Sequence, residues 1–470
     1  MAAPVSRALD WVRTSDSSLP RRVRSTRRWA ARMSARRTHG SLPGAMAATV
    51  AGVALPPVRP VRPRTAAPRR VIEVSTYPLH PRQTGGQLRG YHLAAALADE
   101  PDIEVVVLST TTDRDRAGHR RLGEHLSEDT FALPEPFLDR DTELRLVSGP
   151  VAITDVSIAL MWAAVPELVA ALDRELADAS AVVLVQPYLG PAVQRLGTGL
   201  PVVCDEHNDE WELKSDLLPA SPGGRWLLDR VDEVERAAVE SARIVTASTD
   251  ADLRTLERRY HLPDVNAVVP NGVDTATIEF VTGGDRRRRR LAVNQDLGIP
   301  AQRPTVLFVG SGHGPNIDAG RRILALAHEL PDVEFVLAGR HSTALGVRRL
   351  PDNVTALGVV GDAQLDLLLG GCDVALNPME GGSGSNLKLL SYLAAGIPVV
   401  STEVGARGID AGVAGVRTCE LDELAGAVAD VLAETTDERS EAGREYVEAH
   451  CDWRAIGRRF AELTREHALP

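Results

Sequence analysis

The sequence predicts an α/β protein built from two doubly wound domains, each with a parallel sheet covered by helices on both faces. Three observations lead to this fold class. The chain has 470 residues, and a single core rarely grows beyond ~250–300 residues. Short, uniformly apolar strand patterns alternate with helical stretches in both halves. A polar segment without a strand pattern, residues 282–303, separates the halves. We therefore expect two domains in series with a linker between them.

The first domain should cover residues 70–281. It opens with a buried strand, the Gly-containing loop "HPRQTGG" and a helix over residues 87–99, which together with the next strand make a βαβ unit. The other strands of this domain are recognised by the same apolar pattern and a nearby helical stretch. The expected strands lie at residues 70–79, 103–110, 181–189, 201–209 and 243–249.

The second domain should cover residues 304–438. Its expected strands lie at residues 305–311, 333–339, 353–358, 373–378 and 397–402. Residues 439–470 are helical in pattern, and we expect them to pack back on the first domain. In the linker, residues 282–303, we expect a short helix. Its five consecutive arginines at 286–290 are best interpreted as a solvated helix face, and attraction of phosphate is the weaker interpretation.

Residues 1–69 are expected to form a disordered basic tail. Residues 1–70 carry 15 Arg, no Lys and two acids, which gives this segment a charge of +13. Because the net charge of the chain is −11, the other 400 residues together carry −24. An acidic body argues against nucleic acid as a partner. The basic tail leaves attraction to the anionic inner face of a membrane open. Residues 156–172 are apolar but interrupted by Pro166 and Glu167, which favours a buried or amphipathic helix over a membrane span.

The four cysteines, at positions 204, 372, 419 and 451, are widely spaced. This spacing gives no disulfide or metal-site pattern and suits a reducing compartment, so we expect a cytoplasmic protein. Asp-x-Asp pairs occur at residues 113–115, 139–141 and 250–252. Such pairs can hold a divalent metal through nucleotide phosphates, but 64 acids in the chain make chance pairs common. We expect no metal site and no cofactor.

The most informative stretch is "MEGGSGSNLKLLSYLAAGIPVVST", residues 379–402. A strand should end near Pro378 and a helix should start near Asn386, so the Gly and Ser residues lie at the junction. Free amides and the helix dipole at such a junction attract anions. Lys388, one of only two lysines in the chain, lies about one turn into the helix. A helix cap explains the Gly/Ser run equally well, and the scarcity of lysine favours an anion site, most plausibly for phosphate.

Three further features lie where ligands bind in open α/β sheets, beyond the carboxyl ends of strands. Gly85 and Gly86 precede a helix with Arg89 one turn in, which makes a second helix start that suits anions. A tight turn explains this pair equally well. His207 follows the strand at 201–209, and Arg340 follows the strand at 333–339. A lone His is more often structural and an exposed Arg is more often solvated, but their positions at the cleft edge favour a role in binding.

Taken together, these motifs resemble the retaining, nucleotide-sugar-dependent glycosyltransferases of family 4, which have the GT-B fold of two Rossmann-like domains facing across a cleft. The similarity covers residues 71–460. It is strongest over residues 372–408, "CDVALNPMEGGSGSNLKLLSYLAAGIPVVSTEVGARG". It extends to "TVLFVGSGHGPNIDA", "NVTALGVVGD", "TGGQLRG", "DEHNDEWEL" and "VVPNGVD".

The resemblance implies a nucleotide-diphosphate sugar held by the second domain and an acceptor held by the first, without a metal ion. Lys388 and Arg340 would face the diphosphate, and His207 would bond the donor sugar. We therefore expect these three as catalytic residues. The other expected donor-binding residues are Gly85, Gly86, Glu380, Ser383, Gly384, Ser385 and Asn386. In the retaining mechanism the leaving phosphate helps to deprotonate the acceptor, so the protein needs no strong base.

The sequence departs from the family pattern at two positions. Many members carry glutamates where this chain has Ser383 and Ser391. The first usually contacts the donor sugar and the second the nucleotide ribose. The leading hypothesis is a glycosyltransferase that moves a sugar from a nucleotide sugar to a glycan, lipid or metabolite with retention. The alternative is a weakened GT-B protein that binds a nucleotide sugar or glycan without transfer. A metal-dependent transferase of the GT-A type, using an Asp-x-Asp pair, fits the two-domain pattern less well.

Overall fold

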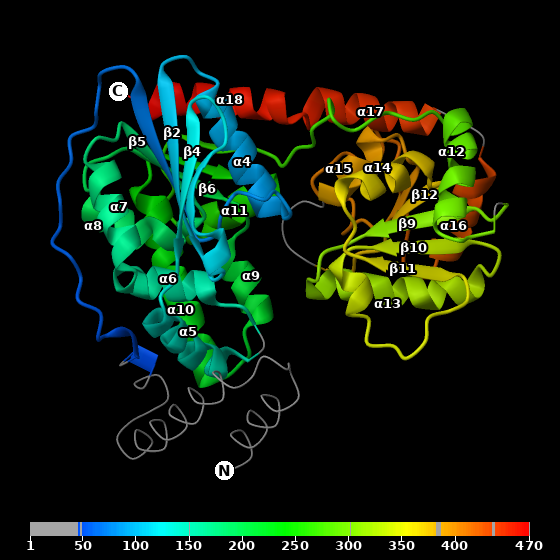
Figure 1. Cartoon of the computed structure of the whole chain (residues 1–470), viewed down its shortest axis with the longest axis horizontal. Helices are drawn as coiled ribbons and strands as arrows, with labels where there is room; N and C mark the ends of the chain where they lie inside the picture. Colours follow the sequence, from blue (N-terminus) through cyan, green and yellow to red (C-terminus); the bar gives the residue numbers. More distant parts are fainter. Residues whose placement is uncertain are drawn as a thin grey trace, which may run out of the picture.

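The computed structural model describes residues 46–469, with residues 48, 150, 301, 382–386 and 435–437 left out. Two α/β domains lie side by side, and the last two helices, α17 and α18, run along one edge of both (Figure 1). Each domain is built on its own largely parallel sheet with helices packed around it. The predicted fold class, two doubly wound domains of the GT-B type, is confirmed.

The sheet of the first domain has the strand order β3-β4-β2-β1-β5-β6-β7-β8. All neighbouring strands pair in parallel except β3 and β4, which are antiparallel. Its strands are β1 (Arg69–Ser75), β2 (Ile103–Thr111), β3 (Gly118–Arg121), β4 (Leu126–Ala132), β5 (Ala181–Val185), β6 (Val202–Glu206), β7 (Ile244–Ala247) and β8 (Asn266–Val268).

Strands β3 and β4 are absent from the sequence prediction. Their residues "GHRR" and "LSEDTFA" contain many charged side chains, and the strands lie at the edge of the sheet. In β4 buried and half-buried residues alternate, so only one face meets the core. Glu128 on the buried face is stabilised by the backbone N–H of Leu79 (2.7 Å) and the hydroxyl of Ser109 (2.8 Å). An edge strand with a buried carboxylate does not show the continuous apolar run of a central strand.

The helices of the first domain cover both faces of this sheet. Helices α6, α7, α8 and α10 contribute to one apolar cluster, and α4 and α18 to the other. The helices are α4 (Gly85–Ala98), α5 (Glu135–Ser148), α6 (Thr154–Met161), α7 (Pro166–Leu176), α8 (Gly190–Leu196), α9 (Glu210–Leu217), α10 (Pro222–Ser241) and α11 (Asp250–Arg259), with the 3₁₀ turns η1 (Arg114–Arg116), η2 (Trp162–Ala164) and η3 (Pro187–Leu189).

The apolar stretch at residues 156–172 forms α6, η2 and α7 rather than one helix. The two helices meet at an angle of 77°, and Pro166 is the first residue of α7, where its missing N–H costs nothing. No single helix in the described ranges is long and apolar enough to cross a membrane, although this bent pair passes the same test by length and composition.

The second domain has the strand order β11-β10-β9-β12-β13-β14. Its strands are β9 (Thr305–Val309), β10 (Glu334–Ala338), β11 (Val354–Gly358), β12 (Val374–Asn377), β13 (Val399–Ser401) and β14 (Arg417–Thr418). Its helices are α12 (Gly283–Asp296), α13 (Gly314–Glu329), α14 (Asp362–Gly371), α15 (Leu387–Ala394), α16 (Leu424–Ala433) and α17 (Glu438–His450), with the 3₁₀ turn η4 (Arg340–Thr343). The strand order reverses beside β9, so β9 and β12 mark the switch point where such sheets bind ligands.

The C-terminal helices divide between the two domains. Helix α17 packs against α15 of the second domain, whereas α18 (Trp453–His467) packs against α4 of the first. Between α17 and α18 the chain returns from the second domain to the first. There it runs beside the segment at Val273, where the chain first passes from the first domain to the second. The N–H of Val273 donates to the carbonyl of Cys451 (2.8 Å), and the N–H of Trp453 donates to the carbonyl of Val273 (3.2 Å). The two crossing segments are therefore bonded to each other.

Order begins earlier than residue 70, which corrects the predicted extent of the tail. The N–H of Arg59 donates to the carbonyl of Arg195 (2.9 Å), and the N–H of Val61 donates to the carbonyl of Thr198 (2.7 Å). These bonds hold the segment before β1 on the surface of the first domain. The sequence did not indicate this because the segment has no helix or strand period. Residues 1–45 lie outside the described residues.

The arginine run in the linker is only partly the solvated helix face that the sequence indicated, because Arg287, Arg288 and Arg289 are exposed but Arg286 is buried. Helix α12 spans most of the linker and packs against α14. Arg286 is 2% exposed and donates to four backbone carbonyls, those of Val281, Leu369, Cys372 and Ala395. Burial lowers the pKa of Arg286 to about 10, which leaves it charged at neutral pH. This arginine stabilises the second domain and is neither a solvated residue nor a phosphate ligand.

We predict that Arg286→Met lowers the free energy of unfolding by roughly 3 kcal/mol, because several buried carbonyls lose their only charged donor. Chemical denaturation of the full chain measures this. The matched control is Arg288→Met, since Arg288 is on the same helix, is 75% exposed and contacts only Asp285 among the described residues; its effect should stay within about 0.5 kcal/mol. Equal effects of the two changes would contradict the structural role of Arg286.

Candidate functional site

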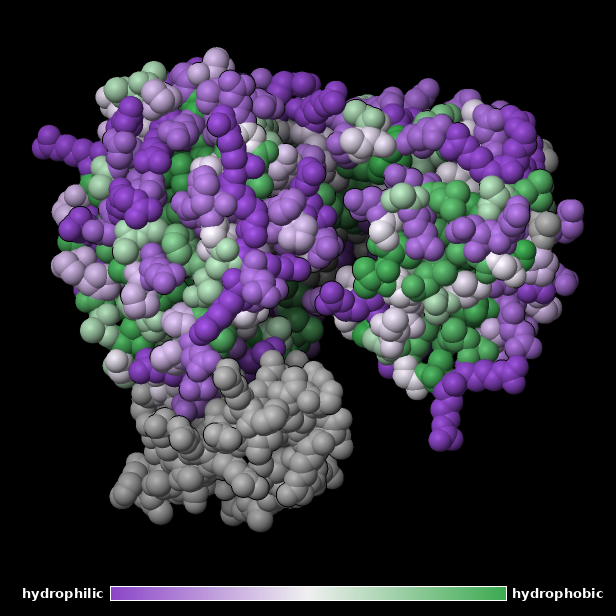
Figure 2. All heavy atoms as spheres, in the orientation of Figure 1, coloured by the Kyte–Doolittle hydropathy of each residue, from purple (hydrophilic) through white to green (hydrophobic). Residues whose placement is uncertain are grey.

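The candidate site lies where the two domains face each other. The space-filling view shows the surface hollowed between them (Figure 2). A pocket of about 280 Å³ opens there at the carboxyl ends of β5 and β6 and the start of α4. It is lined by Tyr77, Thr84, Gly85, Gly86, Arg89, Gln186, His207, Asn208, Asn271 and, from the second domain, Leu387. The sequence singled out four of these residues, Gly85, Gly86, Arg89 and His207.

Helix α4 begins at the pocket with two glycines, Gly85 and Gly86. Thr84 caps the helix and forms a capping box with Gln87, so the start is firmly defined. A methyl group on Gly86 would lie 2.4 Å from the hydroxyl of Tyr77 and 3.4 Å from His207 Nδ1. A methyl group on Gly85 would lie 2.7 Å from Leu387 Cδ1 of the other domain. Both glycines are therefore required by close approach of neighbouring groups, and both predicted positions lie at the cleft.

His207 lies directly after β6 and is 7% exposed. Its Nδ1 is 3.3 Å from the hydroxyl of Tyr77, and its Nε2 is 3.2 Å from Asp205 Oδ2. The second contact has the distance of an ion pair but is not aligned as a full hydrogen bond. The imidazole is thus held between a hydroxyl on the pocket side and a carboxylate behind it, where it can offer or accept a proton at Nδ1.

Arg89 pairs with Asp205 and is not available to anions, which corrects the prediction of an anion-friendly arginine in α4. Its Nε and Nη2 donate to the two carboxylate oxygens at 2.9 and 2.6 Å, and both side chains are 1% exposed. Arg89 also donates to the carbonyl of Val269 (2.7 Å). Burial would raise the pKa of Asp205, but Arg89 and His207 together hold it well below its usual value. The negative charge behind His207 is therefore permanent.

Lys388 forms part of the facing wall in the second domain. Its Nζ donates to Asn316 Oδ1 at 2.8 Å, lies 3.5 Å from Asn377 Oδ1 and lies 5.3 Å from the centre of the Phe308 ring. Burial lowers the pKa of Lys388 to about 8. The ammonium lies at the switch point of the sheet, against the amide oxygens of Asn316 and Asn377.

Arg340 lies at the carboxyl end of β10, as predicted, and is exposed. Its stem crosses Gly312 in the loop after β9, where a methyl group would lie 3.0 Å from Arg340 Cδ. In the described residues its guanidinium has no hydrogen-bond or ion-pair partner. The same loop joins it to the lysine, because Asn316 Nδ2 donates to the Ser311 hydroxyl (3.1 Å) and Asn316 Oδ1 accepts from Lys388. Two cations therefore flank the start of α13.

The remaining predicted donor residues divide into two groups. Glu380 is exposed at the end of β12 and its role stays a prediction. Ser383, Gly384, Ser385 and Asn386 lie outside the described residues. Ser391, which replaces a family glutamate, lies on α15, and its hydroxyl donates to the carbonyl of Leu387 (3.4 Å).

Several site residues were missed or undervalued from the sequence. Asn316 in the first turn of α13 and Asn377 at the end of β12 were not singled out, whereas both lie against the Lys388 ammonium. Gln186 lines the pocket with a backbone φ of 66°, and Glu210 accepts a hydrogen bond from it at 2.8 Å. The positions after β5, β9 and β12 were the available signal, since all lie at carboxyl ends of strands.

The Asp-x-Asp pairs serve local structure. Asp113 accepts from the N–H of Asp115 in η1, and Asp252 lies in the first turn of α11, where Thr249 caps its N–H. Among the described residues, no group of three His, Cys, Asp or Glu side chains is placed to hold a metal ion. The predicted absence of a metal from the reaction stays a prediction.

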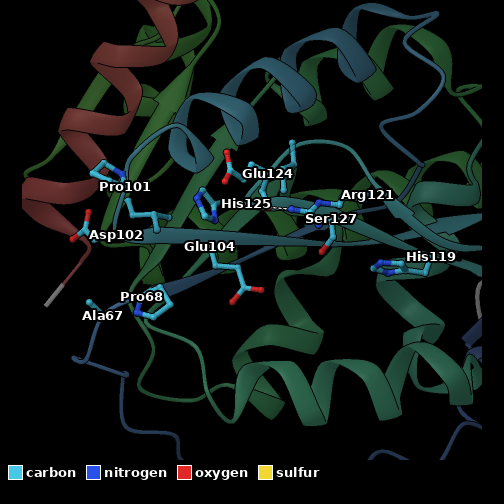
Figure 3. Close-up of a pocket in the computed structure, with 12 residues that line it drawn as sticks. Ala67, Pro68, Pro101, Asp102, Glu104, His119, Arg121, Glu124, His125 and Ser127 are labelled. Atoms are coloured by element: carbon cyan, nitrogen blue, oxygen red, sulfur yellow. Dashed lines mark hydrogen bonds between the residues drawn. The ribbon is translucent and has the colours of Figure 1, made fainter.

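A larger hollow of about 730 Å³ lies elsewhere, at the amino-terminal edge of β2 and β4 (Figure 3). Its labelled side chains include Asp102, Glu104 and His125. Asp102 is paired with Arg69 at 3.3 Å and with Arg465 at 2.9 Å, which ties α18 to β1. Because ligands of open α/β sheets bind at the opposite, carboxyl edge, we do not assign this hollow to the site.

Two family models match the chain. The model "Glycosyltransferase Family 4" matches residues 84–277, and the model "Glycosyl transferases group 1" matches residues 303–434. Among curated relatives, the phosphatidyl-myo-inositol mannosyltransferase of Propionibacterium freudenreichii is 28% identical over 228 residues, 46% of this chain and 54% of the relative. That of Mycolicibacterium smegmatis is 28% identical over 199 residues, 40% of this chain and 48% of the relative. The chain thus spans about half the length of the curated relatives it matches.

Solved structures share the fold over most of the chain. Sucrose-phosphate synthase from Thermosynechococcus elongatus has a TM-score of 0.64 at 18% identity, covering 85% of this chain and 99% of the other. The Anabaena protein HepE, solved with UDP-glucose, has a TM-score of 0.59 at 17% identity, covering 84% and 99%. Since the family models together match more than half of the chain, one in each domain, and the fold agrees, the chain belongs to the glycosyltransferases of family 4 with the GT-B fold.

Proposed function

We propose that the protein transfers a sugar from a nucleotide-diphosphate sugar to an acceptor hydroxyl, with retention of configuration and without a metal ion. One observation carries the proposal. Lys388 and Arg340 flank the start of α13 at the switch point of the second sheet, and the start of α4 with His207 lies on the other side of the cleft. A diphosphate at the cations would direct its sugar towards Gly86 and His207.

The chemistry of transfer suits this arrangement. As the bond between the sugar and the phosphate breaks, positive charge grows on the sugar ring and negative charge on the leaving diphosphate. Cations and helix amides that are already in place stabilise the leaving group without reorganising. Lys388 is fixed by Asn316, and helix α4 starts at a defined cap. The side chains thus supply charge where it develops, which is the role that a metal ion has in other transferases.

On the first-domain wall, His207 would bond the donor sugar through Nδ1 while Asp205 holds the ring from behind. In a retaining transfer the leaving phosphate oxygen accepts the acceptor proton, so no further protein base is required. Support comes from the neighbours: HepE was solved with UDP-glucose, and the trehalose-phosphate synthase of Burkholderia vietnamiensis is described as UDP-forming. The cytoplasmic location, with contact at the inner face of the membrane, stays a prediction.

A donor screen tests the function. The full chain is incubated with UDP-, GDP- and ADP-sugars, without metal and then with Mn²⁺, and nucleotide release and saturation-transfer NMR are followed. We expect binding and release of one nucleotide without metal. An absolute requirement for Mn²⁺ would contradict the metal-free mechanism. Donor binding without turnover with every acceptor tried would support the alternative, a weakened GT-B protein that binds without transfer. That alternative is suggested by the serines at positions 383 and 391, where many family members have glutamates.

We predict that Lys388→Met weakens donor binding by about 10- to 100-fold, because a charged hydrogen bond to the diphosphate contributes ~1.5–3 kcal/mol. Methionine keeps an apolar stem against Phe308, so the fold should persist. Isothermal titration measures the affinity. Arg348→Met is the control, since Arg348 is an exposed arginine of the same domain on the loop between η4 and β11. Unchanged affinity in the lysine variant would contradict the diphosphate assignment.

Donor affinity should also depend on pH. The unbound Lys388 has a pKa of about 8, so its side chain is a charged ammonium below pH 8. Above pH 8 the neutral amine must take up a proton when the donor binds, which weakens binding. We expect the dissociation constant to be flat up to pH 7 and roughly tenfold higher by pH 9. Lys388→Arg keeps its charge over this range, so its affinity should not change between pH 7 and 9. The same pH dependence in both proteins would show that another group is responsible.

Gly86 provides a test of the close approach at α4. We predict that Gly86→Ala lowers turnover on the order of 100-fold, because its methyl group displaces Tyr77 and with it His207. Adding Tyr77→Phe removes the clashing hydroxyl and should restore part of the rate. Gly426→Ala in α16 is the control, since a methyl group there has no neighbour within 4 Å. Full activity of Gly86→Ala would show that the helix start does not contact the reacting groups.

A further inference from the structure

Gln186 has the most unusual backbone among the described residues. It follows β5 with φ 66° and ψ 166°, and it is the single described residue other than glycine with a positive φ. This region of conformational space is occupied almost only by glycine, because a side chain there clashes with the backbone. Such strain persists only where the surroundings enforce it, and it concentrates at sites of function. A glycine at position 186 would relieve the backbone strain, so the presence of a glutamine there calls for a role of its side chain.

The side chain of Gln186 is held in a fixed orientation at the pocket. Its Nε2 donates to Glu210 Oε1 at 2.8 Å, and its backbone N–H donates to the carbonyl of Asp205 at 3.1 Å. Glu210 is itself fixed, since Tyr188 donates to Oε2 at 2.7 Å. Because Nε2 is used, the amide oxygen Oε1 of Gln186 remains as an acceptor at the pocket, and it makes no hydrogen bond within the described residues. An oriented acceptor of this kind suits a hydroxyl donor.

The charges around this part of the pocket disfavour an anion. Glu210 lies behind Gln186, and Asp205 carries a permanent negative charge behind His207. The one arginine among the lining residues, Arg89, is fully engaged by Asp205 and by the carbonyl of Val269. The other lining groups on the first-domain side, besides His207, are neutral hydroxyls, amides and glycines. A phosphate or carboxylate placed against this wall would find no available cation among these lining side chains, because Arg89 is already paired with Asp205.

We propose that Gln186 is a specificity-determining residue that binds a hydroxyl of the acceptor, and that the acceptor group entering this pocket is an uncharged, polyhydroxylated ring. This inference rests on the proposed function, and it names the class of acceptor group that the first domain takes. Gln186 Oε1 accepts a hydrogen bond from one ring hydroxyl, while His207 and Gly86 remain with the donor sugar. A sugar phosphate with its phosphate in this pocket is disfavoured because the one lining arginine, Arg89, is already engaged by Asp205.

The experiment compares acceptors in matched pairs, glucose with glucose 6-phosphate and myo-inositol with inositol 1-phosphate. Nucleotide release from the donor found in the screen is measured with each acceptor, and also without acceptor to obtain donor hydrolysis. The variants are Gln186→Gly, which suits the positive φ and removes only the side chain, and Gln194→Ala, which removes an exposed amide on α8. Saturation-transfer NMR with the same four probes and the nucleotide-bound protein reports acceptor binding without turnover.

We expect the uncharged member of each pair to bind and react better than the phosphorylated one. Gln186→Gly should raise the acceptor KM roughly 5- to 10-fold, the usual effect of one lost hydrogen bond. Donor affinity and donor hydrolysis should stay unchanged. The melting temperature should stay unchanged or rise. Gln194→Ala should behave as the wild type. The inference is overturned if the phosphorylated acceptors are preferred, or if Gln186→Gly leaves the acceptor KM and the NMR signals unchanged. Absence of any donor binding would instead overturn the proposed function.

Discussion

The buried pair of Arg89 and Asp205 is the contact on which the geometry of the first-domain wall depends. It joins α4 to β6, and Thr246 on β7 adds a hydrogen bond to Asp205 at 2.6 Å. Arg89 reaches further to the carbonyl of Val269, where the chain leaves the domain. A buried ion pair contributes little net stability compared with an apolar replacement, but losing one partner is costly. Its effect here is positional: the same carboxylate that anchors the helix start also lies against His207.

The cleft between the domains is formed by few and well-defined contacts. Leu387 at the start of α15 approaches Gly85 so closely that a methyl group on Gly85 would have to displace Leu387 Cδ1. At the opposite end, the two crossing segments bond to each other at Val273, and Arg444 of α17 donates to the carbonyl of Thr275 at 2.7 Å. These contacts hold Lys388 and Arg340, where we propose that the diphosphate binds, opposite the helix start of the first domain. The reaction centre is therefore assembled only when both domains are present.

The two walls of the cleft differ in charge in a way that matches two substrates. The second-domain wall carries the two cations Lys388 and Arg340 beside the start of α13. On the first-domain wall, the buried carboxylates of Asp205 and Glu210 lie behind neutral hydrogen-bonding groups. This difference in charge would direct an anionic donor to the second-domain wall and leave the first-domain wall to an uncharged acceptor, before any specific contact forms. The strained backbone at Gln186 adds a fixed acceptor on the neutral side.

The sequence by itself determined the two-domain α/β fold, because the central strands are continuous apolar runs and the polar linker lacks them. It also located Gly85, Gly86, His207, Arg340 and Lys388, since each follows a strand or begins a helix. The tertiary structure decided what each neighbouring charge does. Arg89 appeared suited to an anion until Asp205, 116 residues away, was placed against it. Gln186 carries no pattern at all, because its strained backbone and its bond to Glu210 exist only in the folded chain. Local patterns report period and position, whereas partners distant in the sequence set which charges remain available to a ligand.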